Sequence, residues 1–341
     1  MALLPHLSFL LSPEGFRPVF HRPWIFTIPF VLAVLTCGWL AGISLQAMAA
    51  DDDSPEVPSP SPSDQWKAVD TAISKGLPKT AIEKLTPILD RAKREGKTAE
   101  WIKAIGQQIV LKESIQGNQL VEKITLMKAE IETADENAKP ILQAILANWY
   151  WAYFQRNAWR FAQRTQTDTE STESDNEDFT KWSLRRILSE IDQRFDDALA
   201  SADVLKGLET SDFAEILDNP TRGLEFRPTL FDVLAENAIR FYSAGEQAGA
   251  KVQDAFVVSA SGPIFDDINA FLAWQPETAD TDSAVLRAME IHQERLRFHL
   301  HDEDQSALLD ANLGRLVFAK NVSTGDEINA RYVKALEVFA R

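Results

Sequence analysis

Apolar side chains recur at intervals of three and four residues along almost the whole chain after Trp66. This spacing places them on one face of an α-helix, which has 3.6 residues per turn. Turns such as Gly76-Leu77-Pro78 interrupt the pattern. The stretch from Ala255 to Ser261 is the one short strand-like run, and we expect it to form no sheet, because a single strand has no partner. The sequence therefore predicts an all-α fold.

The predicted helices are roughly 12–18 residues long and are joined by short turns. Alanine occurs at positions where neighbouring helices pack closely. These features are typical of tetratricopeptide-like stacked helical hairpins, arranged as an α-solenoid or a bundle. The predicted helices lie in residues 66–73, 81–89, 101–110, 120–131, 142–161, 182–195, 213–217, 229–242, 283–318 and 327–339.

The N-terminal segment predicts export. Arg17 and Arg22 precede an uncharged run from Trp24 to Ala50. Such a run is long enough to cross a bilayer, which takes about 20 residues. It ends with the small residues Ala47 and Ala49 in the pattern that signal peptidase recognises. We therefore expect the rest of the chain to lie outside the cytoplasm.

Two interpretations of this segment remain open. Residues 1–49 are either a signal peptide that is removed or a signal-anchor in which residues 24–45 stay in the membrane, since the run exceeds a usual signal-peptide core. Both place the body in the periplasm or on the outer face of the cell envelope.

Changes in composition divide the chain after residue 49. A Pro/Ser-rich stretch predicts an extended linker, and an acidic, hydroxyl-rich stretch without periodicity predicts a disordered loop. The predicted regions are the linker 50–64, a helical repeat region 65–164, the acidic disordered loop 165–181 and a second helical region 182–341.

Charge and cysteine content exclude several classes of function. The formal net charge of −16 disfavours binding to nucleic acid and to anionic lipid. The single cysteine, Cys37, lies in the leader, so the body has no disulfide, no thiolate nucleophile and no cysteine ligand for a metal. We expect a protein partner, no nucleic acid, and contact with the membrane only through the N-terminal segment.

The sequence contains no glycine-rich phosphate loop, HExxH, GxSxG or paired CxxC motif. His292, His299 and His301 are close in sequence, and on a helix the first two share a face from which His301 points away. Metal binding needs three or four convergent ligands, so we interpret this stretch as a solvated, charged helix face. We predict no catalytic residue, no metal site and no cofactor.

Residues 142–161 are rich in aromatic side chains. Trp149 and Tyr153 share one helix face, Trp159 rejoins that face, and Trp182 begins the next apolar run. A helix that is apolar over so wide an arc is typical of the centre of a core. We therefore predict that these four aromatic residues are core residues, and the alternative is a platform that binds carbohydrate.

Four segments occur in a fixed order between residues 66 and 242. They are GLPKTA at 76–81, LANWYWAYF at 146–154, WSLRR at 182–186 and FRPTLFD at 226–232. Their order and spacing resemble the helical N-terminal region of bacterial α2-macroglobulin-like envelope proteins.

That resemblance implies a family of protease traps with β-sandwich domains and, in many members, a Cys-x-Glu-Gln thioester. This chain has no β-rich region and no cysteine after Cys37, so no thioester residue can be assigned. The last predicted helix reaches Arg341 without a capping glycine, which we interpret as a piece of a longer protein.

The sequence thus predicts an exported, non-enzymatic helical scaffold or interaction domain, the N-terminal segment of an α2-macroglobulin-like protease-inhibitor protein without the thioester part. One alternative is an independent tetratricopeptide-like adaptor that binds a protein in the cell envelope. Another is an all-α envelope enzyme that acts on glycans, although the spacing of the acidic residues identifies no catalytic pair.

Overall fold

A computed structural model describes residues 61–116, 120–164, 178–217, 223–245 and 255–340. The described part of the chain is mostly helical, which confirms the all-α class. Its helices are α1 Pro62–Ser74, α2 Pro78–Arg94, α3 Thr98–Gln116, α4 Leu120–Thr133, α5 Lys139–Arg164, α6 Leu184–Leu199, α7 Ala202–Lys206, α8 Leu230–Tyr242, α9 Ile268–Ala273, α10 Ala284–His299, α11 Ser306–Val322 and α12 Ile328–Phe339.

The predicted leader, with Ala47, Ala49 and the proposed anchor at residues 24–45, lies outside the described residues. So does most of the predicted acidic loop, residues 165–177. Among the helices that the structure describes, none combines the length and the apolar character needed to span a membrane.

The first helix begins within the predicted linker. The hydroxyl of Ser61 accepts a hydrogen bond from the backbone N–H of Asp64, and Pro62 is the first helical residue. A serine cap followed by proline favours the start of a helix. The predicted boundary at residue 65 is therefore wrong by three residues.

Two similar turns join the first three helices. Gly76 and Gly96 have positive φ angles of 68° and 66°, which glycine adopts without steric cost. The backbone N–H of Leu77 donates to the carbonyl of Ala72 at 3.0 Å, and the equivalent bond after Gly96 measures 2.9 Å. This pattern of bonds ends a helix and reverses the chain, so α1, α2 and α3 lie antiparallel.

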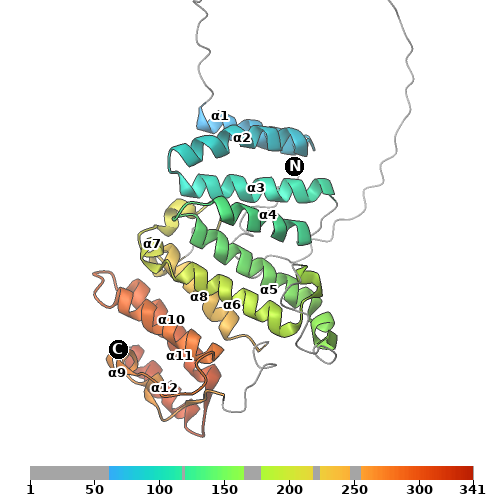
Figure 1. Cartoon of the computed structure of the whole chain (residues 1–341). Helices are drawn as coiled ribbons and strands as arrows, with labels where there is room; N and C mark the ends of the chain where they lie inside the picture. Colours follow the sequence, from blue (N-terminus) through green and yellow to red (C-terminus); the bar gives the residue numbers. More distant parts are fainter. Residues whose placement is uncertain (1–60, 117–119, 165–177, 218–222, 246–254, 341) are drawn as a thin grey trace, which may run out of the picture.

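Successive helices pack on one another along the molecule (Figure 1). Helix α8 contacts α5 and α6 on one side and α10 on another, and α11 and α12 follow. The main hydrophobic core runs from α2 to α11 without a break at the acidic loop. The predicted regions 65–164 and 182–341 thus share one core, whereas α1, α2 and α3 form a small second core of their own.

Three of the four predicted core aromatics are buried. Trp149, Tyr153 and Trp182 are 5%, 6% and 4% exposed, but Trp159 is 64% exposed. The backbone of Asn157 is not helical (φ −117°, ψ 16°), and beyond this kink in α5 Trp159 is turned to solvent whereas Phe161 is buried. The prediction for Trp159 is wrong because it assumed an unbroken helix.

The buried aromatic side chains stack on each other rather than on a surface. Phe179, at the end of the predicted acidic loop, is buried, and its ring lies 4.9 Å from that of Tyr153 and 5.3 Å from that of Tyr150. Tyr150 stacks in turn on Trp182 at 5.8 Å. These rings fill the core, and they present no exposed platform for carbohydrate. Residues 179–181 form a short 3₁₀ helix, so the predicted loop ends before them.

Several predicted elements differ from the observed ones. The predicted helix 283–318 is divided into α10 and α11. The predicted helix 213–217 is absent: Phe213 ends a short 3₁₀ helix, Thr210–Phe213, and residues 214–217 form turns. Strands β1 (Val258–Ser259) and β2 (Ser323–Thr324) pair in parallel, so the strand-like run does find a partner. The short helices α7 and α9 were not predicted.

We expect the two tryptophans of α5 to differ sharply in their contribution to stability. Trp149→Ala should lower the free energy of unfolding by about 3–5 kcal/mol, because it leaves a cavity in the core. Trp159→Ala should change it by less than about 0.5 kcal/mol, because that ring is mostly in solvent. Urea unfolding of both variants checks this, and a similar loss in both would show that α5 has no kink at Asn157.

Candidate functional site

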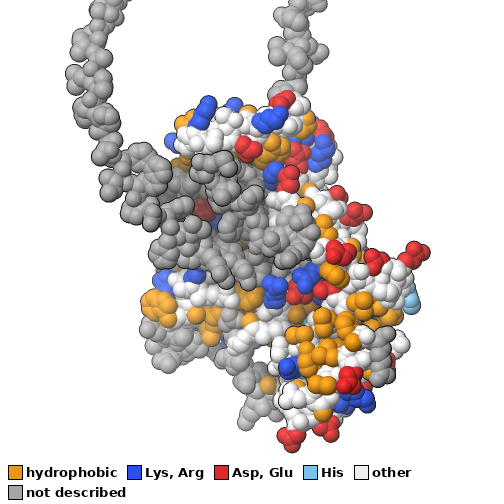
Figure 2. Space-filling model, turned by 180° about the vertical axis from the view of Figure 1, so that it is seen from behind, with side chains coloured by type: hydrophobic (Ala, Val, Ile, Leu, Met, Phe, Trp, Pro, Cys, Tyr) orange, Lys and Arg blue, Asp and Glu red, His pale blue; other side chains and the backbone are white. Residues whose placement is uncertain are grey.

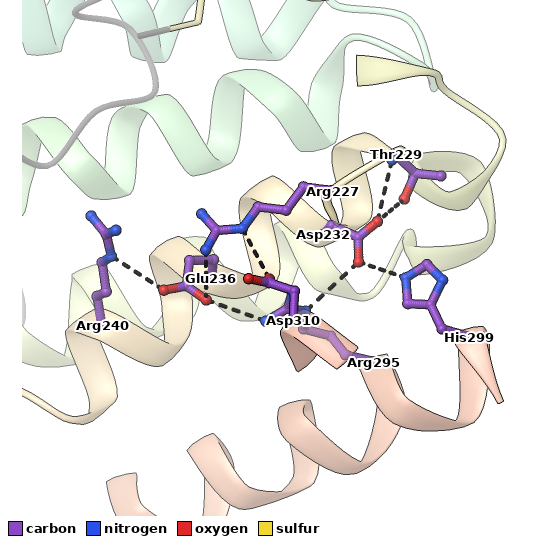
Figure 3. A network of polar contacts seen from close by, with 8 residues as sticks. All are labelled: Arg227, Thr229, Asp232, Glu236, Arg240, Arg295, His299 and Asp310. Carbon is purple, nitrogen blue, oxygen red and sulfur yellow. Dashed lines mark hydrogen bonds and ion pairs between the residues drawn. The ribbon is translucent and has the colours of Figure 1, made fainter. Parts of the chain in front are cut away.

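A network of charged side chains joins α8, α10 and α11 (Figure 3). The segment before α8 and α8 itself supply most members, and of these Asp232 and Glu236 contact Arg295 on the facing helix α10. The residues drawn are Arg227, Thr229, Asp232, Glu236, Arg240, Arg295, His299 and Asp310.

Arg295 is the centre of this network, and its side chain is fully buried. Its Nη1 donates to Glu236 and its Nη2 to Asp310, each at 3.2 Å, while its Nε lies 3.7 Å from Asp232. One guanidinium thus faces three carboxylates that come from two helices. Removing one member of such a buried ion-pair network leaves a buried charge without its partner, which lowers the free energy of unfolding by about 3–5 kcal/mol.

His299 lies between two carboxylates. Its Nε2 is 2.8 Å from Asp232 and its Nδ1 is 2.7 Å from Asp302. Burial by itself would lower the pKa of His299, but the hydrogen bonds to Asp232 and then Asp302 outweigh it, and the pKa is raised. Both ring nitrogens are engaged, so this imidazole has no free nitrogen with which to accept a proton from a substrate.

Asp232 connects the network to the start of α8. Its Oδ2 accepts from the backbone N–H and the hydroxyl of Thr229, at 3.2 and 2.8 Å. Burial would raise the pKa of Asp232, but the hydrogen bond from His299 and the charge of Arg295 lower it below its ordinary value. The arrangement can hold these charges in place.

The predicted solvated face of the histidine stretch is wrong for two of its members. His292 and His299 are each 1% exposed, whereas His301 lies in the turn after α10 and is exposed. Burial, with the charges of Arg295 and Arg315, lowers the pKa of His292 well below its ordinary value, so its ring is neutral at pH 7. The structure does not bring the three histidines together, and within its described residues no group of His, Cys, Asp and Glu could hold a metal ion.

A signal for this network was present in the sequence. His292, Arg295 and His299 are spaced three and four residues apart, which is the spacing of a buried helix face. Residues of this type are rarely buried without partners. The partners on α8 and α11 cannot be inferred from the local sequence, so the charge network could not be assembled from it.

A cleft with a volume of about 810 Å³ lies at the other end of the molecule. It is bounded by α1, by the turn and first residues of α3, and by residues 208–216. Trp66 forms one wall, and its Nε1 donates to Glu100 at 2.8 Å. The ammonium of Lys103 lies 4.0 Å from the centre of the Trp66 ring and is also bonded to Glu215.

Glu100 is held in place from behind the cleft. Arg91 donates to both of its carboxylate oxygens, at 3.0 and 2.6 Å. Burial would raise the pKa of Glu100, but the hydrogen bonds from Arg91 and Trp66 lower it. A paired carboxylate of this kind is geometrically well defined, so the Trp66 wall is fixed before any ligand arrives.

The other lining residues of the cleft are of mixed character. Lys67 and Lys97 are exposed cations, Asp212 is an exposed anion, and the half-buried Ala99 and Leu208 contribute apolar surface. The cleft therefore offers apolar area together with charges of both signs.

No protein-family model, no curated protein and no solved structure matches this chain. The fold and the cleft define an all-α protein with an open, aromatic-walled cleft between helices. What that cleft does must be argued from its own residues.

The charge network predicts a specific dependence of stability on pH. The pKa of His299 is raised above its unfolded value of about 6.5. The contribution of His299 to the free energy of unfolding is therefore complete below pH 6.5, and it is lost as the pH rises through the pKa of the folded state. His299→Gln should cost about 1.5–3 kcal/mol at pH 6 and less at alkaline pH, as measured by urea unfolding across this range.

His301→Gln is the matched control, because His301 is exposed two residues away. His301→Gln should change the free energy of unfolding only slightly at every pH. A cost of His299→Gln that grows as the pH rises would contradict the assignment of an imidazolium between Asp232 and Asp302.

Proposed function

We propose that this chain is a non-enzymatic helical scaffold that binds a segment of a partner protein in the cleft beside Trp66. The observation that carries the proposal is the cleft itself, with its volume of about 810 Å³ and its fixed aromatic wall. Ligand sites in proteins typically measure about 300–1,000 Å³ and combine apolar surface with a few placed polar groups.

The chemistry of the lining favours a peptide over other ligands. Cations at Lys67 and Lys97 and an anion at Asp212 can pair with side chains of either charge, and Trp66 and Leu208 offer apolar contact. A uniformly anionic ligand such as nucleic acid would meet the carboxylates of this cleft and the net charge of −16. A protein segment of mixed composition fits these groups better.

An exported location supports this function. We infer that residues 1–49 direct the chain to the cell envelope, where a helical scaffold with no cysteine after residue 37 needs no oxidative folding. The four segments that resemble α2-macroglobulin-like proteins favour a role as the leading part of such a protein. Without that relationship, the same cleft would serve a tetratricopeptide-like adaptor.

An enzyme that acts on glycans is less well supported. It would need two carboxyl groups facing one cleft, with the pKa of the acid raised. Burial raises the pKa of Asp192, but this side chain accepts a hydrogen bond from Tyr242 at 2.7 Å and does not line the cleft.

The cleft can be tested with peptides selected from a random library displayed on phage. Lys67→Glu should weaken the selected peptides about tenfold, or 1.4 kcal/mol, because it reverses a charge at the rim of the cleft. Lys128→Glu makes the same change on an exposed position of α4 outside the cleft and should leave binding unchanged. The measurement is the dissociation constant of each synthetic peptide.

Asp212→Lys, on the opposite wall, gives an independent check. Peptides that bind the Lys67→Glu and Asp212→Lys variants as tightly as the original chain would refute a role for the cleft. Loss of binding in the Lys128→Glu variant as well would point to a general effect of charge.

The relationship to α2-macroglobulin-like proteins has its own test. If the chain is the leading segment of such a protein, the coding sequence that follows Arg341, or the adjacent gene, should encode β-sandwich domains. Genomic sequencing settles the point, and an unrelated downstream gene would leave the adaptor as the better proposal.

A further inference from the structure

Helix α11 has an apolar face that nothing in the described part of the chain covers. Leu309, Leu313 and Val317 follow one another at steps of four residues and are 46%, 40% and 42% exposed. The opposite face, with Ala311 and Phe318, is buried, and the ring of Phe318 lies 5.0 Å from that of His292 on α10. Hydrophobic side chains gather over the C-terminal part of the molecule in Figure 2. A continuous apolar stripe on an exposed helix is typical of an interaction surface.

The two ends of this stripe carry opposite charge. The turn before α11 contains Glu303 and Asp304, both exposed, and Asp304 accepts a hydrogen bond from the backbone N–H of Ser306. Lys320, one turn beyond Val317, is exposed, and its ammonium lies 4.9 Å from the ring of Tyr332. Along α11 and the turn before it, the charge therefore changes from acidic, through the apolar stripe, to the single cation Lys320.

A surface of this kind is complementary to itself when two copies meet antiparallel. A two-fold axis at Leu313 places Leu309 of one copy against Val317 of the other, and the reverse. The same axis places Lys320 opposite Ser306, the first residue of the partner's α11, next to the turn that contains Glu303 and Asp304. A parallel pair would instead bring the like charges together.

We propose that two copies of this chain associate through α11, packed antiparallel about Leu313. The partner on this surface is a second copy, because its apolar stripe and its end charges match the stripe and charges of the same surface turned by 180°. The surface lies at the opposite end of the molecule from α1 and the cleft (Figure 1). Association therefore leaves both clefts open and makes the scaffold bivalent.

Single cysteines test this arrangement in the full chain. The sequence has one cysteine, so Cys37→Ser gives a cysteine-free background for expression in cells. Leu313→Cys should cross-link to itself with a bifunctional maleimide that spans about 8–10 Å, the separation of packed helices. Val110→Cys, on an exposed position of α3, is the control and should give no dimer on a denaturing gel.

A mixture of two differently tagged copies determines the direction of packing. Leu309→Cys in one copy should cross-link to Val317→Cys in the other. Neither variant should cross-link to itself, because eight residues separate the equivalent positions by about 12 Å along the axis. Cross-linking of each variant with itself would instead show a parallel pair and overturn the proposal.

Charge reversal provides a second readout. Glu303→Lys and Lys320→Glu should each reduce the Leu313→Cys product severalfold, and the two changes together should restore it. Absence of the dimer in the Leu313→Cys chain, or an equal amount from Val110→Cys, would refute the proposed interface. A double variant that stays as weak as either single one would refute the charge pairing.

Discussion

Helix α5 carries apolar side chains around most of its circumference, and the rest of the fold covers them. A helix of this kind is stable in water only when other elements surround it. Helices α4, α6 and α8 all pack against α5. The 3₁₀ turn at residues 179–181 closes another side, where Phe179 inserts between Tyr150 and Tyr153. The helical geometry of α5 breaks at Asn157, beyond which Trp159 is exposed and Phe161 returns to the core.

Helix α8 connects this aromatic core to the C-terminal helices, and it does so with two kinds of contact. On one side Phe241 packs against Trp151 and Phe195, with ring centres 5.7 and 5.6 Å apart. On the other side Asp232 and Glu236 bind Arg295. Apolar contact is non-directional, whereas buried charges must meet specific partners. The network therefore specifies how α10 sits on α8 more strictly than packing alone would.

The sequence predicted the fold class well and the sites poorly, for physical reasons. Helical periodicity is a local property, so most helices and the breaks at Gly76 and Gly96 could be predicted. The exposure of Trp159 depends on a backbone kink that leaves no mark on the apolar pattern. The burial of His292 and His299 depends on which side chains of other helices pack against them. A charged stretch is usually solvated, and α8, 67 residues earlier, supplies Asp232, which together with Asp302 makes burial of His299 tolerable.

By itself, the sequence determined that the body is helical and acidic and that it lacks cysteine after residue 37, because composition and a period of 3.6 residues are properties of the chain alone. The order of residues also predicts an export segment at the N-terminus. Only the tertiary structure decided which charges are buried and where surfaces remain open. The cleft joins Trp66 to Phe213, and the α11 stripe is exposed because no described helix covers it. Both depend on contacts between distant segments, which a local pattern does not encode.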